Sequence, residues 1–273
     1  MVKCSAGLYN ARRNRFIVAC PMRLKDWCYA SGPVPRTRAT FCSRTSNTVS
    51  STSTRCNDEF RDAINQRLRE FAVEVAVDEA VRPAAVAVTV VDGGFGADLP
   101  GMPKHDDRQD YAALILTRRS SRLRKHAGQW AFPGGRVDEG ENAEETAMRE
   151  MSEEIGLHLS PTHILGRLDD FVTRSGFRIT PVVFWAGSIE AFAPNPDEVQ
   201  SVHRIPVHEF LRGDAPMLDH SEGEGDAPVL RMPVGGDWIA APTAAIIYQF
   251  REVCVLGRDT RVAHYDQPKF AWR

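Results

Sequence analysis

The stretch "GGRVDEGENAEETAMREMSEEIGL" (residues 134–157) decides the fold of this 273-residue chain. It contains eight carboxylates and only two basic residues, and several acids fall on a predicted helix, where like charges repel. Asn142 is a good N-cap with Glu145 three residues later, as in a capping box, and Gly156 suits the left-handed conformation that ends a helix. The pattern predicts a helix over residues 143–155.

Three acids of this helix are crowded together beside its apolar face. The apolar face is formed by Ala143, Ala147, Met148, Met151 and Ile155 and is expected to pack on a sheet. Glu150, Glu153 and Glu154 fall on the adjoining arc, with no Lys at i±4. A solvated charged face is the usual explanation for acids on a helix, but it suits acids at the edge of a core badly. Clustered carboxylates favour Mg²⁺ or Mn²⁺, and such sites usually act on phosphates.

Hydrophobic periodicity outside this helix predicts an α/β fold. A stripe of Phe60, Ile64, Leu68 and Phe71 indicates an amphipathic helix that begins near Asp58. Strands are expected at residues 84–91, 111–119, 129–135, 164–174, 177–187 and 199–207, polar loops at 92–110 and 219–228, and a last helix at 241–257. Strands separated by single helices, without regular βαβ alternation, predict a mixed sheet with helices on both faces.

Charge and cysteines divide the chain into two parts. Residues 1–56 carry ten Lys/Arg and one acid, a net charge of +9, so the remainder carries −11 of the total −2. An acidic body disfavours a nucleic-acid binder, and no apolar run is long enough to span a bilayer. Cys254 is alone in the body, which favours a reducing compartment. We predict a disordered, basic, Ser/Arg-rich extension over residues 1–57 and one domain over residues 58–273. The alternatives for the extension are a mitochondrial presequence and a wrongly assigned start codon. The expected location is the cytoplasm or, if the source is eukaryotic and the extension is a presequence, mitochondria.

Gly135, Glu141 and "REMSEEIGL" (residues 149–157) follow the spacing GX5EX7REUXEEXGU, in which U is aliphatic. This pattern resembles the Nudix box. The resemblance implies the Nudix-type α/β/α sandwich with a mixed β-sheet and the Nudix loop-helix motif. It also implies hydrolysis of a nucleoside diphosphate linked to another moiety.

The same resemblance implies roles for individual residues of the box. Glu150, Glu153 and Glu154 would bind Mg²⁺ or Mn²⁺, and the carbonyl of Gly135 would complete the metal shell. Arg149 would pair with Glu141 and orient the helix. Nudix enzymes often take their general base from a later loop, so Glu198 is the first candidate for the base and Glu153 the second.

The preceding segment "ILTRRSSRLRKHAGQWAFPGG" (residues 115–135) resembles the upstream element of Nudix coenzyme A diphosphatases, LLTxR[SA]x3Rx3Gx3FPGG, with Ile115 in place of the first Leu. It contains a dense cationic patch, and arginine forks match phosphate oxygens. The substrate-binding candidates are Arg118, Arg119, Arg124, Arg174 and Arg178. For the last two, a surface ion pair is an equal alternative.

We therefore expect a metal-dependent diphosphatase that splits coenzyme A, or a derivative, into 3′,5′-ADP and 4′-phosphopantetheine. One alternative is a Nudix hydrolase for ADP-ribose, dinucleotides or another nucleoside diphosphate derivative. A second alternative is a non-catalytic nucleotide sensor, although a sensor has no need of the full set of metal carboxylates. The expected partner is a small molecule, not nucleic acid or a membrane, and a homodimer is an open expectation because dimers are common in the family. The loops at 92–110 and 212–228 are expected to shape the selectivity pocket.

Overall fold

The computed structural model describes residues 54–77, 80–123, 126–221 and 227–268. These residues belong to one unit of the chain, residues 48–273. The helices are α1 (Asp58–Glu70), α2 (Ala143–Ile155) and α3 (Thr243–Phe250), with short helical turns η1 (Pro161–His163), η2 (Val207–Leu211) and η3 (Arg251–Val255). The strands are β1 (Arg82–Gly96), β2 (Lys104–Arg119), β3 (Trp130–Ala131), β4 (Gly134–Arg136), β5 (Ile164–Arg167), β6 (Phe171–Val172), β7 (Phe177–Gly187), β8 (Val199–Pro206), β9 (Met217–Asp219), β10 (Val229–Val234) and β11 (Asp237–Ala240).

Eight strands form one mixed sheet, and β1 lies near its centre. β1 pairs antiparallel with β2, where Val90 faces Leu114, and parallel with β7, where Val88 faces Val183. The short strand β4 pairs antiparallel with β1, and β8 pairs antiparallel with β2. A separate antiparallel sheet contains β9, β10 and β11. β4 therefore lies beside the first half of the central strand and leads into the loop before α2.

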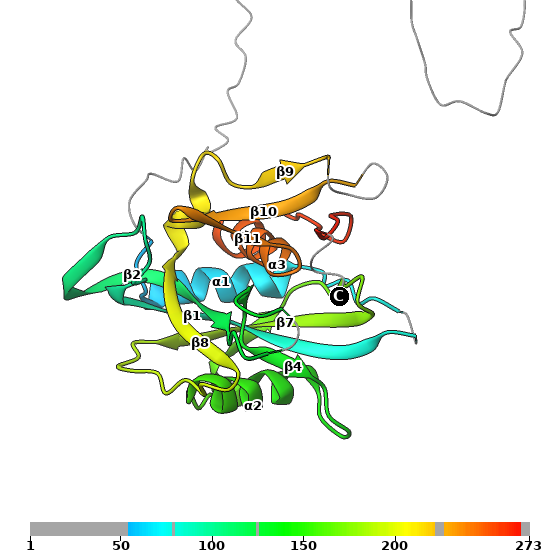
Figure 1. Cartoon of the computed structure of the whole chain (residues 1–273), viewed down its shortest axis with the longest axis horizontal. Coiled ribbons are helices and arrows are strands. Elements are labelled where there is room, and N and C mark those ends of the chain that lie inside the picture. Colours follow the sequence, from blue (N-terminus) through cyan, green and yellow to red (C-terminus); the bar gives the residue numbers. More distant parts are fainter. Residues whose placement is uncertain (1–53, 78–79, 124–125, 222–226, 269–273) are drawn as a thin grey trace, which may run out of the picture. The chain divides into compact units, whose positions relative to one another are not determined.

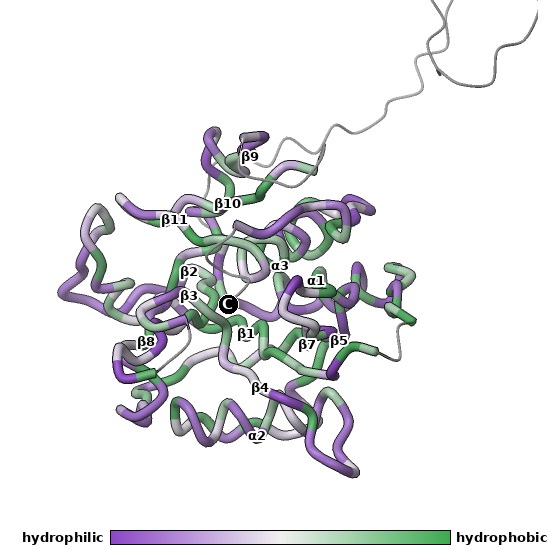
Figure 2. The backbone as a smooth tube through the Cα atoms, turned by 45° about the vertical axis from the view of Figure 1, so that its right-hand side comes forward, coloured by the Kyte–Doolittle hydropathy of each residue, from purple (hydrophilic) through white to green (hydrophobic). Residues whose placement is uncertain are grey.

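Helices cover both faces of the sheet (Figure 1), because the central strands are apolar on both sides. Leu114 of β2 belongs to the core shared with α1, α3 and β10, whereas its neighbour Ile115 belongs to the core under α2. This alternation follows from the two-residue period of a strand. Figure 2 shows the same division as apolar central strands with polar outer loops. The predicted α/β/α sandwich with a mixed sheet is confirmed.

Most predicted elements lie where the periodicity indicated. α1 buries Phe60, Ile64 and Leu68, and α2 has the expected capping box and the left-handed Gly156, at φ 69°. The predicted loop at 92–110 is wrong, because β1 and β2 continue into it as a hairpin with register shifts. Its polar side chains hid the strands, since a hairpin that projects from the sheet needs no apolar stripe.

The predicted extension, residues 1–57, lies outside the described residues except for its last four. Cys56 N donates to Asp110 O at 2.7 Å, and Ala112 N donates to Thr54 O at 2.6 Å. The folded part therefore includes residues 54–57. Within the described part of the chain, no helix has the length and apolar character needed to cross a membrane.

Candidate active site

Three carboxylates meet at the edge of the sheet. Glu150 and Glu154 project from α2, and Glu198 lies in the turn before β8. One oxygen from each lies within 4.8 Å of the others. Glu154 is only 5% exposed, because it lies beside the apolar face that packs α2 against the sheet. The two helix acids were predicted to bind metal, whereas Glu198 was predicted only as a base, since sequence spacing gives no distance between a helix and a remote turn.

The environment of this cluster opposes negative charge. Burial raises the pKa of Glu154 to about 8, and the neighbouring Glu150 adds to the increase. Burial also raises the pKa of Glu150, although Arg149 acts in the opposite direction. A divalent cation would remove this cost, because it replaces carboxylate repulsion with attraction. The donors are carboxylate oxygens, so the described residues fit Mg²⁺ or Mn²⁺.

Arg149 connects the acidic helix to the loop before it. Its Nε donates to Glu141 Oε1 at 2.9 Å and its Nη2 donates to Glu141 Oε2 at 3.1 Å. Its Nη1 donates to Glu150 Oε1 at 2.9 Å and to Glu153 Oε2 at 3.1 Å. The pairing with Arg149 lowers the pKa of Glu141 to about 2. Arg149 thus holds Glu150 in place and is positioned by Glu141.

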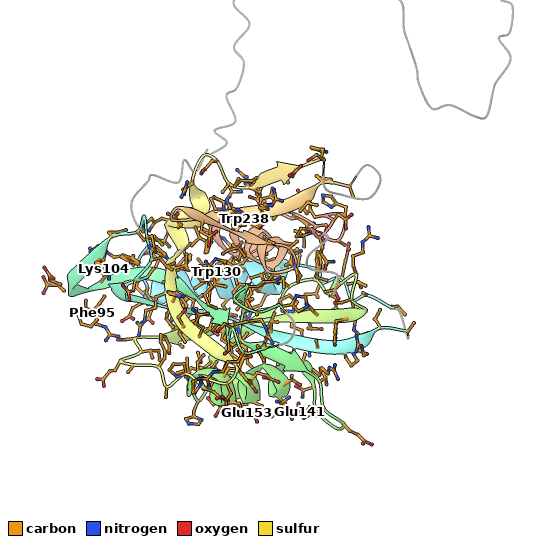
Figure 3. The ribbon with its side chains drawn as sticks, in the orientation of Figure 1. Phe95, Lys104, Trp130, Glu141, Glu153 and Trp238 are labelled. Carbon is orange, nitrogen blue, oxygen red and sulfur yellow. The ribbon has the colours of Figure 1, made fainter. Side chains whose placement is uncertain are left out.

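Glu153 is not part of the three-carboxylate cluster, which brings together Glu150, Glu154 and Glu198. The Glu153 side chain is 57% exposed and pairs with Arg149. Figure 3 labels Glu153 together with Glu141 at the lower side of the molecule. The roles of Glu153 as a metal ligand and second candidate base stay predictions.

Gly135 leaves the space that the Glu150 carboxylate occupies. A Cβ atom at this position would lie 2.0 Å from Glu150 Oε1, so any other residue would force the Glu150 carboxylate to move. The glycine is therefore favoured by this close approach and not by an unusual backbone conformation. This contact places the backbone of β4 beside the cluster. A metal contact from the Gly135 carbonyl stays a prediction.

The turn that carries Glu198 is fixed at two points. Asn195 N donates to the Glu154 carbonyl at 2.9 Å, which ties the turn to the end of α2. Ser120 N donates to the Glu198 carbonyl at 2.8 Å, and Ser120 Oγ donates to the Pro196 carbonyl at 3.2 Å. Ser120 is buried. It thus holds Glu198 close to the helix acids, a role that sequence reasoning did not assign to it.

A cavity of about 530 Å³ adjoins the cluster at Gly134 and Gly135. Its walls come from β1, β3, β4, the start of β7, and the β10–β11 hairpin with the first residue of α3. The volume suits a nucleotide-sized ligand. None of the described residues of 92–110 and 212–228 lines this cavity, and residues 222–226 of the second loop lie outside the described residues. The expectation that those loops shape the selectivity pocket stays a prediction.

The predicted cationic residues have different surroundings. Arg119 lines the cavity, attracts Glu154, and has a buried Nε without a hydrogen-bond partner in the described part of the chain. Arg118 also lines the cavity but pairs with Asp237. Arg174 pairs with buried Asp266 at 3.0 Å, and Arg178 lies 3.6 Å from Asp170; neither lines the cavity. Arg124 lies outside the described residues.

The sequence did not predict the aromatic part of the cavity wall. This part comes from three separate segments of the chain and contains Trp130, Phe177 and Trp238, with Asp237 beside Trp238. Gly235 and Gly236 between two short apolar runs were a signal for the hairpin that carries Asp237 and Trp238. No pattern indicated which face of that hairpin meets the catalytic sheet, because this depends on long-range packing.

Comparison with known proteins agrees with this site. The NUDIX domain family model matches residues 101–225. The chain is 46% identical over 100 residues to an uncharacterized Nudix hydrolase, NudL, of Yersinia enterocolitica. This alignment covers 36% of this chain and 51% of that relative. It is 43% identical over 99 residues to NudL of Yersinia pestis, with 36% and 50% covered. The alignments therefore span about half the length of these curated relatives.

The solved structures that the chain resembles include a MutT/nudix family protein from Enterococcus faecalis, with 18% identity and a TM-score of 0.41. The match covers 70% of this chain and 73% of that chain. Another is the NUDIX domain of Shewanella oneidensis NrtR in complex with ADP ribose, with 21% identity, a TM-score of 0.39, and 64% and 89% covered. The matched residues 101–225 contain the acidic helix, its preceding loop and Glu198. Residues 101–225 of the chain are thus similar to the NUDIX domain family.

Proposed function

We propose that the chain is a metal-dependent diphosphatase that hydrolyses coenzyme A or a derivative to 3′,5′-ADP and 4′-phosphopantetheine. The proposal that the chain hydrolyses a diphosphate is supported by the cluster of Glu150, Glu154 and Glu198, which adjoins a nucleotide-sized cavity. The observation that favours coenzyme A is the resemblance of residues 115–135 to the upstream element of coenzyme A diphosphatases.

The side chains of the site divide the work. Glu150, Glu154 and Glu198 would hold Mg²⁺ or Mn²⁺, which would offset charge on the diphosphate and lower the pKa of the attacking water. Arg119 would donate its unpaired Nε to a phosphate oxygen, because a buried donor without a partner is costly. Glu198 is favoured over Glu153 as the general base, since Glu153 is engaged by Arg149.

Two other functions remain in competition. An intact site of this kind also suits ADP-ribose, a dinucleotide or another nucleoside diphosphate derivative, because each presents the same diphosphate. A non-catalytic sensor would bind a nucleotide in the cavity, and its carboxylates would take no part in a reaction. The buried Glu154 opposes the sensor, since an unused carboxyl with a raised pKa only destabilises the fold.

Turnover of matched substrates tests the proposal. The purified chain is incubated with coenzyme A, dephospho-coenzyme A, acetyl-coenzyme A and ADP-ribose, each with Mg²⁺ or Mn²⁺, and products are identified by mass spectrometry. We expect 3′,5′-ADP from coenzyme A, slower turnover of dephospho-coenzyme A, and no product from Glu150→Gln. Faster turnover of ADP-ribose than of coenzyme A would favour the second function. Binding without turnover of any of the four compounds would favour the sensor.

A further inference from the structure

One wall of the cavity contains a guanidinium group that is already paired with a carboxylate. Arg118 Nη2 donates to Asp237 Oδ2, and Arg118 Nη1 donates to the Gly128 carbonyl at 3.0 Å. The Cζ atom of Arg118 lies 3.9 Å from the centre of the Trp130 ring. An arginine held this way presents a flat face and little net charge, so it suits stacking better than phosphate binding.

Trp130 is a fixed support for this guanidinium. Trp130 is 8% exposed, its Nε1 donates to Asp237 Oδ2 at 3.3 Å, and its carbonyl accepts from Thr243 Oγ1 at 3.3 Å. The edge of the His203 ring packs against it, with 5.2 Å between ring centres. The sheet and the C-terminal segment therefore both hold the indole in one orientation.

Trp238 borders the same cavity from the β10–β11 hairpin. It is 38% exposed, and the Arg231 Cζ lies 4.6 Å from its ring centre. In the view of Figure 3, Trp238 lies above Trp130 and the labelled acids lie below it. The lining of the cavity includes Gly135, which lies beside the Glu150 carboxylate, as well as Arg118 and Trp238. A ligand whose diphosphate lies at the carboxylates has its remaining part available for Arg118 and Trp238.

From this geometry we infer that Arg118, backed by Trp130 and held by Asp237, is the stacking platform for the purine base of the substrate nucleotide, and that Trp238 covers the base at the cavity mouth. Base stacking on aromatic and guanidinium planes is tolerant of base identity and contributes strongly to binding. Asp237 is the positioning residue of this subsite, because its bond to Arg118 holds the planar guanidinium over the Trp130 ring. Asp237 and Trp238 lie beyond the residues matched by the family model, so the C-terminal part of this chain completes a subsite whose platform, Arg118 on Trp130, lies within the matched residues.

A second aromatic surface in the cavity fits an anion better than a base. Two guanidinium groups lie over Phe177: Arg82 at 4.0 Å and Arg136 at 5.5 Å from Cζ to the ring centre. No carboxylate pairs with either guanidinium among the described residues. Their combined charge favours a phosphate, and this separates Phe177 from the neutralised wall at Arg118.

Binding in the absence of metal tests the subsite. The full chain in EDTA is titrated with ADP and, separately, with inorganic pyrophosphate, by calorimetry and by tryptophan fluorescence. The parent is expected to bind ADP more tightly than pyrophosphate and to lose fluorescence with ADP alone. Arg118→Lys keeps the charge but has no plane, so we expect about tenfold weaker ADP binding and unchanged pyrophosphate binding. Trp238→Ala should weaken ADP binding similarly, and Trp238→Phe should restore most of it.

Matched variants make the outcome decisive. Phe95→Ala is the control, because Phe95 is 60% exposed and does not line the cavity. Normal ADP binding by Arg118→Lys would overturn the inference. Loss of ADP binding by Phe177→Leu with unchanged pyrophosphate binding would also overturn it, because the base would then stack at Phe177. Thermal melting of each variant identifies a folding defect, and the exposed Trp238 pair remains informative if an Arg118 variant unfolds. The inference builds on the proposed function, yet the two can fail separately: ADP can bind at this wall without coenzyme A turnover, and coenzyme A can be hydrolysed without stacking here.

Discussion

At the scale of single residues, the acids of the opening stretch have separate tasks that their spacing only partly revealed. Glu145 caps α2 through the Asn142 backbone at 2.9 Å, and Glu144 pairs with Arg167 at 2.6 Å, so these acids serve the fold. Glu150 and Glu154 instead face Glu198, which is about 45 residues away in the chain. A helical period predicts which acids share a face, but it cannot tell which remote acid completes the group.

The cost of burying Glu154 gives a pH-dependent prediction. In the folded, metal-free protein its carboxyl stays protonated up to about pH 8, whereas in the unfolded chain it ionises near its ordinary value of 4.5. Between these pH values the unfolded state binds fewer protons, so the free energy of unfolding falls as pH rises and the loss is complete above about pH 8. Glu154→Gln removes this loss. We expect the variant to be more stable than the parent at pH 8.5, by on the order of a few kcal/mol, and equally stable at pH 4.

Urea unfolding of both proteins in EDTA at the two pH values measures this difference. With Mn²⁺ added at pH 8.5, the parent should gain stability and the variant should gain little, because the ion binds only the folded state of a protein that retains its ligand. A stability difference that stays constant from pH 4 to pH 8.5 would contradict the burial argument.

At the scale of elements, the site depends on a junction between α2, the turn before β8, and the end of β2. The sequence predicted each of these elements, since the period and the caps are local. It did not predict their junction, because the bonds that join Ser120 to the Glu198 turn connect segments 76 or more residues apart. The upstream element containing Ser120 was interpreted through its arginines, yet Ser120 acts on the acidic site and Arg118 pairs with Asp237.

Removing the Ser120 hydroxyl should loosen the Glu198 turn. Ser120→Ala loses the bond from Oγ to the Pro196 carbonyl, and we expect about fivefold weaker Mn²⁺ binding, equivalent to ~1 kcal/mol, with the fold intact. Calorimetric titration with Mn²⁺ measures the change without requiring a substrate. Ser221→Ala is the matched control, because its hydroxyl donates to Asp219 at an exposed site. Equal Mn²⁺ affinity in Ser120→Ala and the parent would show that the backbone bonds alone hold the turn.

At the scale of the whole molecule, the sandwich was predictable and its C-terminal completion was not. Alternating strands and two amphipathic helices indicated layers on both faces of a mixed sheet. The sheet of β9, β10 and β11 has short strands, and neither its position against α3 nor its contribution to the cavity follows from periodicity. The matched family segment ends at residue 225, although the core does not.

A chain that ends at residue 225 should therefore fail to fold. Leu230, Met232, Ile239, Ile246 and Phe250 share one core with Phe60 and Leu114. Each buried apolar side chain contributes roughly 1.5–3 kcal/mol to the free energy of unfolding. The loss of five such side chains is therefore comparable to the whole net stability of a typical domain, ~5–15 kcal/mol. We expect aggregation or loss of cooperative thermal unfolding, measured by soluble yield and circular dichroism. A chain that lacks only residues 1–47 is the control and should melt as the full chain does. Cooperative melting of the shortened 1–225 chain would show instead that the C-terminal part is a separable addition, and that the family segment carries the fold without it.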